Sequence, residues 1–299
     1  MKKLLVPVDF SDYTWSTVTA ALDLAARIDA EVRLLHVFDD PFVESDLDDT
    51  TIRNAVSRYT ENLLHKMETD AKTQIADLKT KIDGYQADRK LSVSVSTEIE
   101  RGFPVDTIVA SARRWVAQLI IMGSRGHSKM ERLMFGTITK GVISQAHCAV
   151  LSLPAGIAWQ PPQKVLYASD FSSWDEIAIA RILNLLDAYK VTLHVTHFSE
   201  SRHDEDAFKL HQLEEKLRQD HKSERIRYEV VDSRVLLSAM KEYIDSNDID
   251  LLALTTRKLS GLQRIFTAAR PLMCCIKLIN RYWSSTKNSG TSKTCRHSW

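Results

Sequence analysis

Glycine, cysteine and long hydrophobic runs are scarce in this chain of 299 residues, and each scarcity excludes a class of protein. Nine glycines are too few for collagen-like or linker-like material. No stretch of about 18 consecutive apolar residues occurs, so we expect no membrane-spanning helix and no membrane partner. The four cysteines form no CxxC pair, which favours free thiols in a reducing compartment over disulfides.

An excess of charge of one sign is also lacking, because 40 Lys and Arg residues face 39 Asp and Glu residues. Nucleic-acid-binding proteins carry a basic excess, so we expect no nucleic acid partner. The chain opens with MKKLLVPVDF, in which Pro7 and Asp9 interrupt the apolar run before it reaches the length of a signal peptide. Together these features predict a globular protein located in the cytoplasm.

Three sequence blocks occur twice in the same order, which indicates an internal duplication. The block KKLLVPVDFS at residues 2–11 is matched by QKVLYASDFS at residues 163–172, so that Asp9 corresponds to Asp170. Two further pairs of matching blocks follow, at 32–38 and 191–198 and at 119–135 and 251–267.

The duplication predicts two domains of unequal length. Gly156, Pro161 and Pro162 favour an extended connection between the two copies. We therefore divide the chain into a first domain at 1–154, a linker at 155–162, a second domain at 163–283 and a polar, disordered tail at 284–299.

Short apolar runs alternate with helical patterns along the first copy, which is typical of an α/β fold with a parallel sheet. We predict that each copy is a five-stranded parallel sheet flanked by helices, and that the second copy is shortened after Ala269. For the first copy we expect strands at 3–8, 32–38, 91–99, 119–122 and 148–153, and helices at 15–30, 50–82, 104–117 and 136–146.

The helical pattern at 50–82 has apolar residues spaced by three or four, from Ile52 to Ile82. Such a stripe is typical either of a coiled-coil seam or of the core face of one long helix. We favour the core face, because a strand is expected soon after a turn at Gly84.

Four of the nine glycines lie between residues 123 and 141, directly after an apolar strand. Gly123, Gly126 and Gly136 follow the spacing G-x2-G-x9-G, and Thr137 completes it. Glycines at a strand end let backbone N–H groups approach phosphate oxygens, and a helix that begins near Gly136 favours an anion at its N-terminus. The hydroxyls of Thr137 and Thr139 and the positive charge of Arg125 or Lys140 add to this phosphate-binding pattern.

On these motifs the chain resembles tandem universal stress proteins, with a first domain of the ATP-binding type. The resemblance covers nearly all of residues 1–283 and implies two Rossmann-like domains. It rests on G-x2-G-x9-G-T and on the opening VPVDFS at residues 6–11. It implies that Asp9 bonds the adenine edge beside Pro7 and Val8, that Val37 contacts base and ribose, and that ribose and phosphates are held by Met122, Gly123, Gly126, Gly136, Thr137, Ile138 and Thr139.

Other interpretations of single residues remain open. Asp9 is also a candidate cap for the helix that begins near residue 12. His127 lies inside the glycine loop and is a candidate phosphate contact, whereas His36, His194 and His197 fit packed or backbone-bonded side chains on strands. No Ser-His-Asp order and no metal-ligand spacing is present, so we assign no catalytic and no metal-binding residue.

The second copy departs from the glycine pattern at every position. Thr255, Lys258 and Ala268 stand where the first copy has glycine, and Ala269 stands at the position of Thr137. Side chains there crowd a phosphate loop, so we expect no nucleotide pocket in this copy.

The sequence thus predicts a stress-response protein whose first domain binds ATP, with or without Mg²⁺, and which acts as a nucleotide-dependent regulatory module. Two alternatives remain: a slow ATPase that uses the same pocket, and a structural adaptor without nucleotide. The resemblance also implies dimerisation through the last strand of the first copy, AVLSLP at 149–154, either between two chains or between the two halves of one chain.

Overall fold

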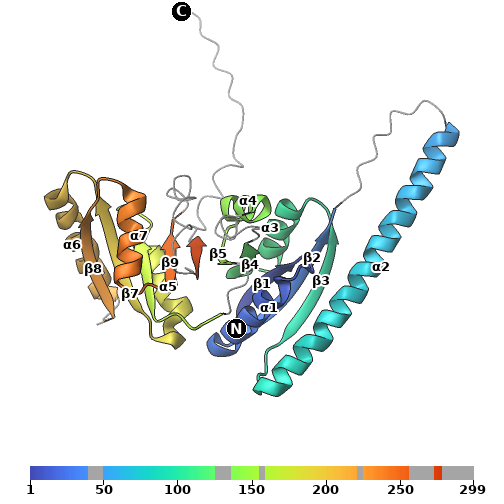
Figure 1. Ribbon diagram of the computed structural model, residues 1–299, viewed down its shortest axis with the longest axis horizontal. Coiled ribbons are helices and arrows are strands. Elements are labelled where there is room, and N and C mark those ends of the chain that lie inside the picture. The colour runs from blue at the N-terminus through green and yellow to red at the C-terminus, as the bar shows by residue number, and fades with distance from the viewer. Residues whose placement is uncertain (40–49, 125–135, 155–158, 221–224, 256–272, 278–299) are drawn as a thin grey trace, which may run out of the picture.

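The computed structural model describes residues 1–39, 50–124, 136–154, 159–220, 225–255 and 273–277. One sheet runs through both halves of the chain, in the strand order β3-β2-β1-β4-β5-β10-β9-β6-β7-β8 (Figure 1). Its strands are β1 (Lys2–Val8), β2 (Ala30–Phe38), β3 (Val95–Arg101), β4 (Leu119–Ser124), β5 (Ala149–Pro154), β6 (Lys164–Ala168), β7 (Thr192–Ser199), β8 (Ile226–Asp232), β9 (Leu251–Leu254) and β10 (Met273–Lys277).

The helices connect these strands and cover both faces of the sheet (Figure 1). They are α1 (Thr14–Ile28), α2 (Thr50–Arg89), α3 (Pro104–Arg114), α4 (Thr137–Gln145), α5 (Asp175–Leu186), α6 (His203–Asp220) and α7 (Leu236–Ser246), with a short 3-10 helix η2 (Asp187–Tyr189) after α5. Among the described residues, no helix combines the length and the apolar character needed to cross a bilayer.

Strand β1 lies at the centre of the first half, paired in parallel with β2 on one side and β4 on the other. Alternate side chains point to opposite faces of a strand, and both faces of β1 are buried. Leu4 and Val6 pack in the cluster formed with α1 and α2, whereas Leu5 packs in the cluster formed with α3 and α4. The strand order reverses at β1, which opens a crevice at the carboxyl ends of β1 and β4.

The first two strands of the second half, β6 and β7, repeat the arrangement of β1 and β2 at an offset of 161 residues. Phe10 and Phe171 both adopt left-handed backbone angles, with φ of 56° and 55°. Their rings pack against His36 and His197, and the Nδ1 atoms of these histidines lie 2.9 and 3.0 Å from the carbonyl oxygens of Val8 and Ser169. Both histidines are therefore packed against rings and bonded to the backbone.

The two halves meet at the middle of the sheet. Strand β10 pairs antiparallel with β5, with Ile276 opposite Leu151 and Lys277 opposite Val150. A second contact joins α1 to the region after α5, where the Nε atom of Arg27 donates to the carbonyl of Ala188 at 3.3 Å. The edge of β5 is thus occupied by a strand of the same chain.

Helix α2 corrects two expectations from the sequence. Gly84 does not form a turn, because α2 continues to Arg89 and the chain turns at Lys90, whose φ is 55°. Buried Ile82 before Gly84 and partly buried Tyr85 after it pack on the core, which offsets the roughly 1 kcal/mol that glycine costs inside a helix. The following strand consequently begins at Val95 and not at residue 91.

The second half contains a buried histidine, His194, that is hydrogen-bonded in series with Tyr243 and Glu229. The hydroxyl of Tyr243 donates to Glu229 at 2.8 Å, so the Nδ1 atom of His194, 2.9 Å away, donates to that hydroxyl. The Nε2 atom of His194 has no hydrogen-bond partner among the described residues. Burial lowers the pKa of His194 below its usual value, because protonation of Nε2 would place a positive charge on a buried ring.

We predict that His194 makes the stability of the protein fall as the pH drops. A depressed pKa means that, as the pH falls, the unfolded chain binds the proton before the folded chain does. The stabilisation that comes from neutral His194 is therefore fully present above pH ~6.5 and is lost as the pH falls below that value. Urea unfolding of the wild type and of His194→Gln at pH 7.5 and 5.5 measures the effect. The variant should lose less stability between the two pH values, and equal losses would contradict the assignment.

Candidate functional site

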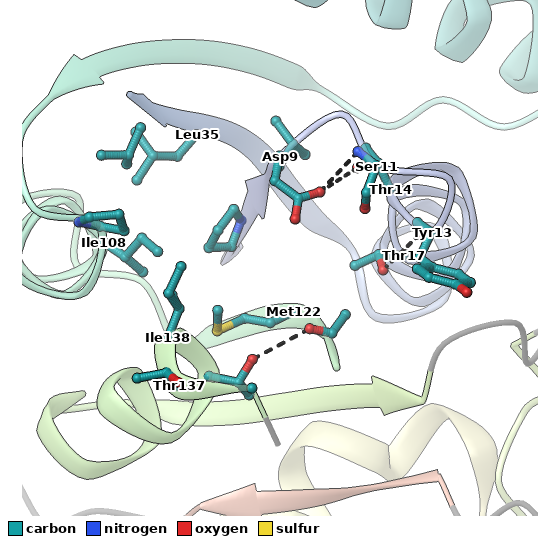
Figure 2. Close-up of a pocket in the computed structure, with 17 residues that line it drawn as sticks. Asp9, Ser11, Tyr13, Thr14, Thr17, Leu35, Ile108, Met122, Thr137 and Ile138 are labelled. Carbon is teal, nitrogen blue, oxygen red and sulfur yellow. Dashed lines mark hydrogen bonds between the residues drawn. The ribbon is translucent and has the colours of Figure 1, made fainter. Parts of the chain in front are cut away.

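A cavity of about 370 Å³ lies at the carboxyl ends of β1, β2 and β4, between the N-termini of α1 and α4 (Figure 2). Ten of the twelve site residues suggested by the sequence line it: Pro7, Val8, Asp9, Val37, Met122, Gly123, Gly136, Thr137, Ile138 and Thr139. Arg125, Gly126 and His127 lie outside the described residues. Segments far apart in the chain are thereby brought to one site.

Asp9 is fixed at the rim of this cavity by the turn between β1 and α1. Its Oδ1 atom accepts hydrogen bonds from the backbone N–H of Ser11 at 3.0 Å and from the hydroxyl of Thr14 at 3.1 Å. The N-cap position of α1 is Tyr13, which makes no side-chain cap bond, so Asp9 is not the helix cap. It closes an Asx turn, which holds an acceptor-only carboxylate in one position.

The wall beyond Asp9 is mostly apolar. Leu35 and Val37 extend from β2, Ile108 comes from α3, and Met122 comes from β4 (Figure 2). A mostly apolar cavity with a few fixed polar groups is the usual form of a small-molecule site.

Seven lining residues were missed by the sequence reasoning: Ser11, Tyr13, Thr14, Thr17, Leu35, Pro104 and Ile108. Leu35 was accessible to prediction, because it lies two positions before Val37 and therefore on the same face of the strand. Ile108 was not, because its place in the wall depends on how α3 docks on the sheet.

Helix α4 presents its N-terminus to the opposite end of the cavity (Figure 2). Gly136 is the N-cap residue, and it provides no side chain to satisfy the first N–H groups of the helix. The first turn contains no acidic residue. Unsatisfied N–H groups and the positive end of the helix dipole favour an anion at this end.

The glycines around the cavity serve different purposes. A Cβ atom on Gly123 would stand 3.1 Å from the Oγ1 of Thr17, and one on Gly141 would stand 2.7 Å from a methyl carbon of Val105. Gly141 therefore lets α4 pack closely on α3, which positions the helix N-terminus. A Cβ on Gly136 would meet none of the described residues within 4 Å, so no contact in that part of the chain requires glycine there.

Asp9 is the one carboxylate among the described lining residues. No group of three or more His, Cys, Asp or Glu side chains with the geometry to hold a metal ion occurs in the part of the chain that the structure describes. The described cavity thus offers a hydrogen-bond acceptor at one end and an anion-binding helix terminus at the other.

The corresponding region of the second half carries larger side chains at two positions that line the cavity of the first half. Phe198 stands at the position of Val37, is 5% exposed and packs edge-on against Tyr243, with 6.0 Å between ring centroids. Thr255, which is buried, stands at the position of Gly123. The counterparts of the other loop glycines, Lys258 and Ala268, and Ala269 at the position of Thr137, lie outside the described residues.

A buried carboxylate organises this region of the second half. Asp175, at the position of Thr14, is 1% exposed and accepts hydrogen bonds from the hydroxyls of Tyr167 at 2.9 Å, Ser172 at 2.7 Å and Ser169. Asp170, which corresponds to Asp9, accepts a hydrogen bond from the backbone N–H of Ser172 at 3.3 Å. The turn of the second half is therefore held by hydrogen bonds from Ser172 to both Asp170 and Asp175.

Comparison with known proteins decides the family. The sequence profile of the universal stress protein family matches residues 1–154 and 162–268. The chain belongs to the universal stress protein family. The two matched segments are successive copies of this domain, and the second is shorter than the first.

Two sequence relatives and a solved structure agree with this assignment. The chain is 28% identical to universal stress protein MJ0531 of Methanocaldococcus jannaschii over 158 residues, which cover 50% of this chain and 80% of the relative. It is 26% identical to universal stress protein MJ0577 of the same organism over 156 residues, which cover 50% of this chain and 93% of that protein. The crystal structure of a universal stress protein from Archaeoglobus fulgidus superposes with a TM-score of 0.70 at 18% identity, covering 93% of this chain and 98% of that chain.

We predict that Asp175→Ala destabilises the protein far more than Asp170→Ala. Removing Asp175 leaves three buried or partly buried hydroxyls without their acceptor, and hydrogen bonds to a charged group contribute about 1.5–3 kcal/mol each. We expect a loss of about 3 kcal/mol or more for Asp175→Ala and about 1 kcal/mol for Asp170→Ala. Thermal unfolding measures both, and similar losses would contradict the organising role of Asp175.

Proposed function

We propose that the cavity in the first half binds an adenine nucleotide, ATP with or without Mg²⁺. The observation that carries this proposal is the pairing of a fixed carboxylate and an anion-attracting helix N-terminus at opposite ends of one apolar cavity. The exocyclic amine of adenine is a hydrogen-bond donor that suits Asp9, and a phosphate chain suits the N-terminus of α4.

Different residues of the cavity contact the base, the ribose and the phosphates in this proposal. The ring lies in the slot formed by Leu35, Val37 and Ile108, where apolar contact replaces water. The ribose lies over Met122 and Gly123, where the missing side chain leaves room for close backbone approach. The phosphates lie against Gly136 to Thr139, and the resemblance adds Arg125 and Gly126 to these contacts. This arrangement gives a reason for Gly136, which no contact among the described residues requires.

Nucleotide binding serves regulation in this proposal. A phosphate chain at the N-terminus of α4 orders the rim of the cavity, where Ile138 is 45% exposed and available to a protein partner in the cytoplasm. The second half pairs with the first through β5 and β10, as an internal pseudo-dimer. The second half supplies a surface for protein contacts and does not supply a second nucleotide site.

A slow ATPase is less well supported by the described residues. Hydrolysis of ATP needs a group that orients or deprotonates the attacking water near the terminal phosphate. Asp9 lies across the cavity from α4 (Figure 2), so it is placed for the base and not for the phosphates. Release of ADP measured over hours separates binding from hydrolysis.

We predict that Gly123→Val weakens ATP binding at least tenfold. A Cβ at this position already approaches Thr17 at 3.1 Å, and the two methyl groups of valine add bulk where the ribose would lie. Isothermal titration of the full chain with ATP measures the change. Thr255→Val is the matched control at the corresponding strand end of the second half, and it should bind ATP as the wild type does. Undetectable binding by the wild type, or equal binding by Gly123→Val, would contradict the proposal.

We also predict that Asp9→Asn weakens ATP binding about tenfold without changing the melting temperature. The amide oxygen still accepts from Ser11 and Thr14, so the turn is preserved, but the amide nitrogen is a donor and repels the amine of the base. Titration and thermal unfolding of the same preparation give both quantities. Unchanged affinity would show that Asp9 does not contact the base.

A further inference from the structure

The histidine that packs on the Asp-Phe-Ser turn has different neighbours in the two halves. In the first half, His36 packs on Phe10, and its Nδ1 atom lies 2.9 Å from the carbonyl oxygen of Val8. It forms no ion pair with any of the described residues. In the second half, the corresponding His197 stacks on Phe171, with 4.1 Å between ring centroids, and it also faces a carboxylate on α6.

Both ring nitrogens of His197 lie beside hydrogen-bond acceptors. The Nδ1 atom is 3.0 Å from the carbonyl oxygen of Ser169, and the Nε2 atom is 3.3 Å from Oδ2 of Asp206. A neutral imidazole has one N–H group, so one of its nitrogens would turn a lone pair toward an acceptor. The protonated ring donates from both nitrogens, and the geometry therefore favours this form.

The carboxylate of Asp206 is held in place for this contact. Its side chain is 11% exposed, and Oδ2 also accepts a hydrogen bond from the hydroxyl of Ser199 at 2.7 Å. Burial acts to raise the pKa of Asp206, but the hydrogen bond from Ser199 and the positive charge of His197 outweigh burial and lower the pKa. An ionised acceptor consequently faces His197 throughout the pH range in which histidine titrates.

We propose that His197 and Asp206 form a pH-sensitive switch that holds the start of α6 on the sheet. The protonated ring extends from β7, stacks on the turn after β6 and pairs with the first turn of α6 (Figure 1). When the pH rises, the proton on Nε2 passes to the solvent, the ion pair is lost, and a lone pair faces the carboxylate. The start of α6 then opens from the sheet more readily.

The sign of this pH response follows from the folded state. A histidine that gains an acceptor on folding binds its proton more tightly in the folded chain. The stabilisation is fully present below pH ~6.5, the usual value for histidine, and is lost as the pH rises through the higher midpoint of the folded chain. This direction is opposite to that of His194, so the sign of the response distinguishes the two histidines.

The charged groups of α6 around His197 leave this direction unchanged. Lys209 opposes a positive ring, but its side chain is 46% exposed and its Nζ atom lies 3.4 Å from Oδ1 of Asp206. The positive end of the helix dipole is offset by the acidic residues of the first turn, which are Asp204, Glu205 and Asp206.

The other elements around the ring add mainly negative charge. On β8, Asp232 lies two positions after the residue that pairs with His197, and therefore on the same face of the sheet. It contacts His203 at 2.8 Å, but both side chains are exposed, so solvent screens this pair. Tyr228, on the same face, stays neutral because burial raises its pKa to about 12. The turn after β6 adds Asp170, and α5 begins at Asp175, whose carboxylate accepts three hydroxyl groups.

Nitrogen-15 NMR of the histidine rings in the full chain tests the protonation of His197 directly. We expect the ring of His197 to be mostly protonated at pH 7, and Asp206→Asn to lower its titration midpoint by about one unit or more, which is a tenfold loss of proton affinity. Asp204→Asn, at an exposed position of the same helix turn, is the matched control and should leave the midpoint nearly unchanged. A ring that is mostly neutral at pH 7, or a midpoint that Asp206→Asn does not lower, would overturn the proposal.

Hydrogen exchange tests the release of α6. Between pH 6.5 and 8.5, after correction for the intrinsic exchange rate, we expect the amides at 203–210 to lose protection at least threefold. His197→Gln cannot carry the charge and should lack this change, whereas His36→Gln, at the corresponding position of the first half, should retain it. Circular dichroism confirms that each variant is folded. Constant protection in the wild type, or a loss that persists in His197→Gln, would show that this ion pair does not control α6.

Discussion

The structure depends on the burial of β1 on both of its faces. Leu4, Leu5 and Val6 are fully buried, and their alternation commits α1 and α2 to one face of the sheet and α3 and α4 to the other. Because β1 lies between β2 and β4 in a parallel sheet, its carboxyl end opens into the crevice where the strand order reverses. The turn that carries Asp9 and Gly123, near the end of β4, meet there for this reason.

The two copies show how one turn can serve two purposes. In both, an Asp-Phe-Ser turn packs its phenylalanine ring against a strand histidine. In the first copy the space beyond the turn is a cavity bordered by a helix N-terminus. In the second copy, Phe198 replaces Val37 and packs against Tyr243, and Asp175 accepts hydrogen bonds from three hydroxyls. Duplication therefore kept the scaffold, and side-chain size changed the site.

Much of this was predictable from the sequence, for identifiable reasons. Apolar strands and repeated blocks are local patterns, so the α/β fold and the duplication followed from them. The glycine spacing pointed to Gly123, Gly136, Thr137 and Thr139, and the resemblance to a known family supplied the other six of the ten lining residues. Contacts that depend on docking were not predictable: Ile108 enters the cavity only because α3 packs across the sheet. The prediction of a turn at Gly84 was wrong, because tertiary packing of Ile82 and Tyr85 outweighs the low helix propensity of glycine. How much of the apolar stripe of α2 is buried likewise depends on where the sheet ends: Ala71, Ile75, Leu78 and Ile82 are buried, and the N-terminal part of the helix extends past the sheet (Figure 1).

The central claim is that only the first copy holds a nucleotide. Native mass spectrometry of the full chain, equilibrated with excess ATP, tests this claim directly because it counts the ligands bound to each chain. The account predicts a single added ATP per chain at saturation, and a lower occupancy of Gly123→Val than of the wild type at ATP concentrations that only partly fill the wild type. Two nucleotides per chain, or equal occupancy of the wild type and Gly123→Val, would contradict it.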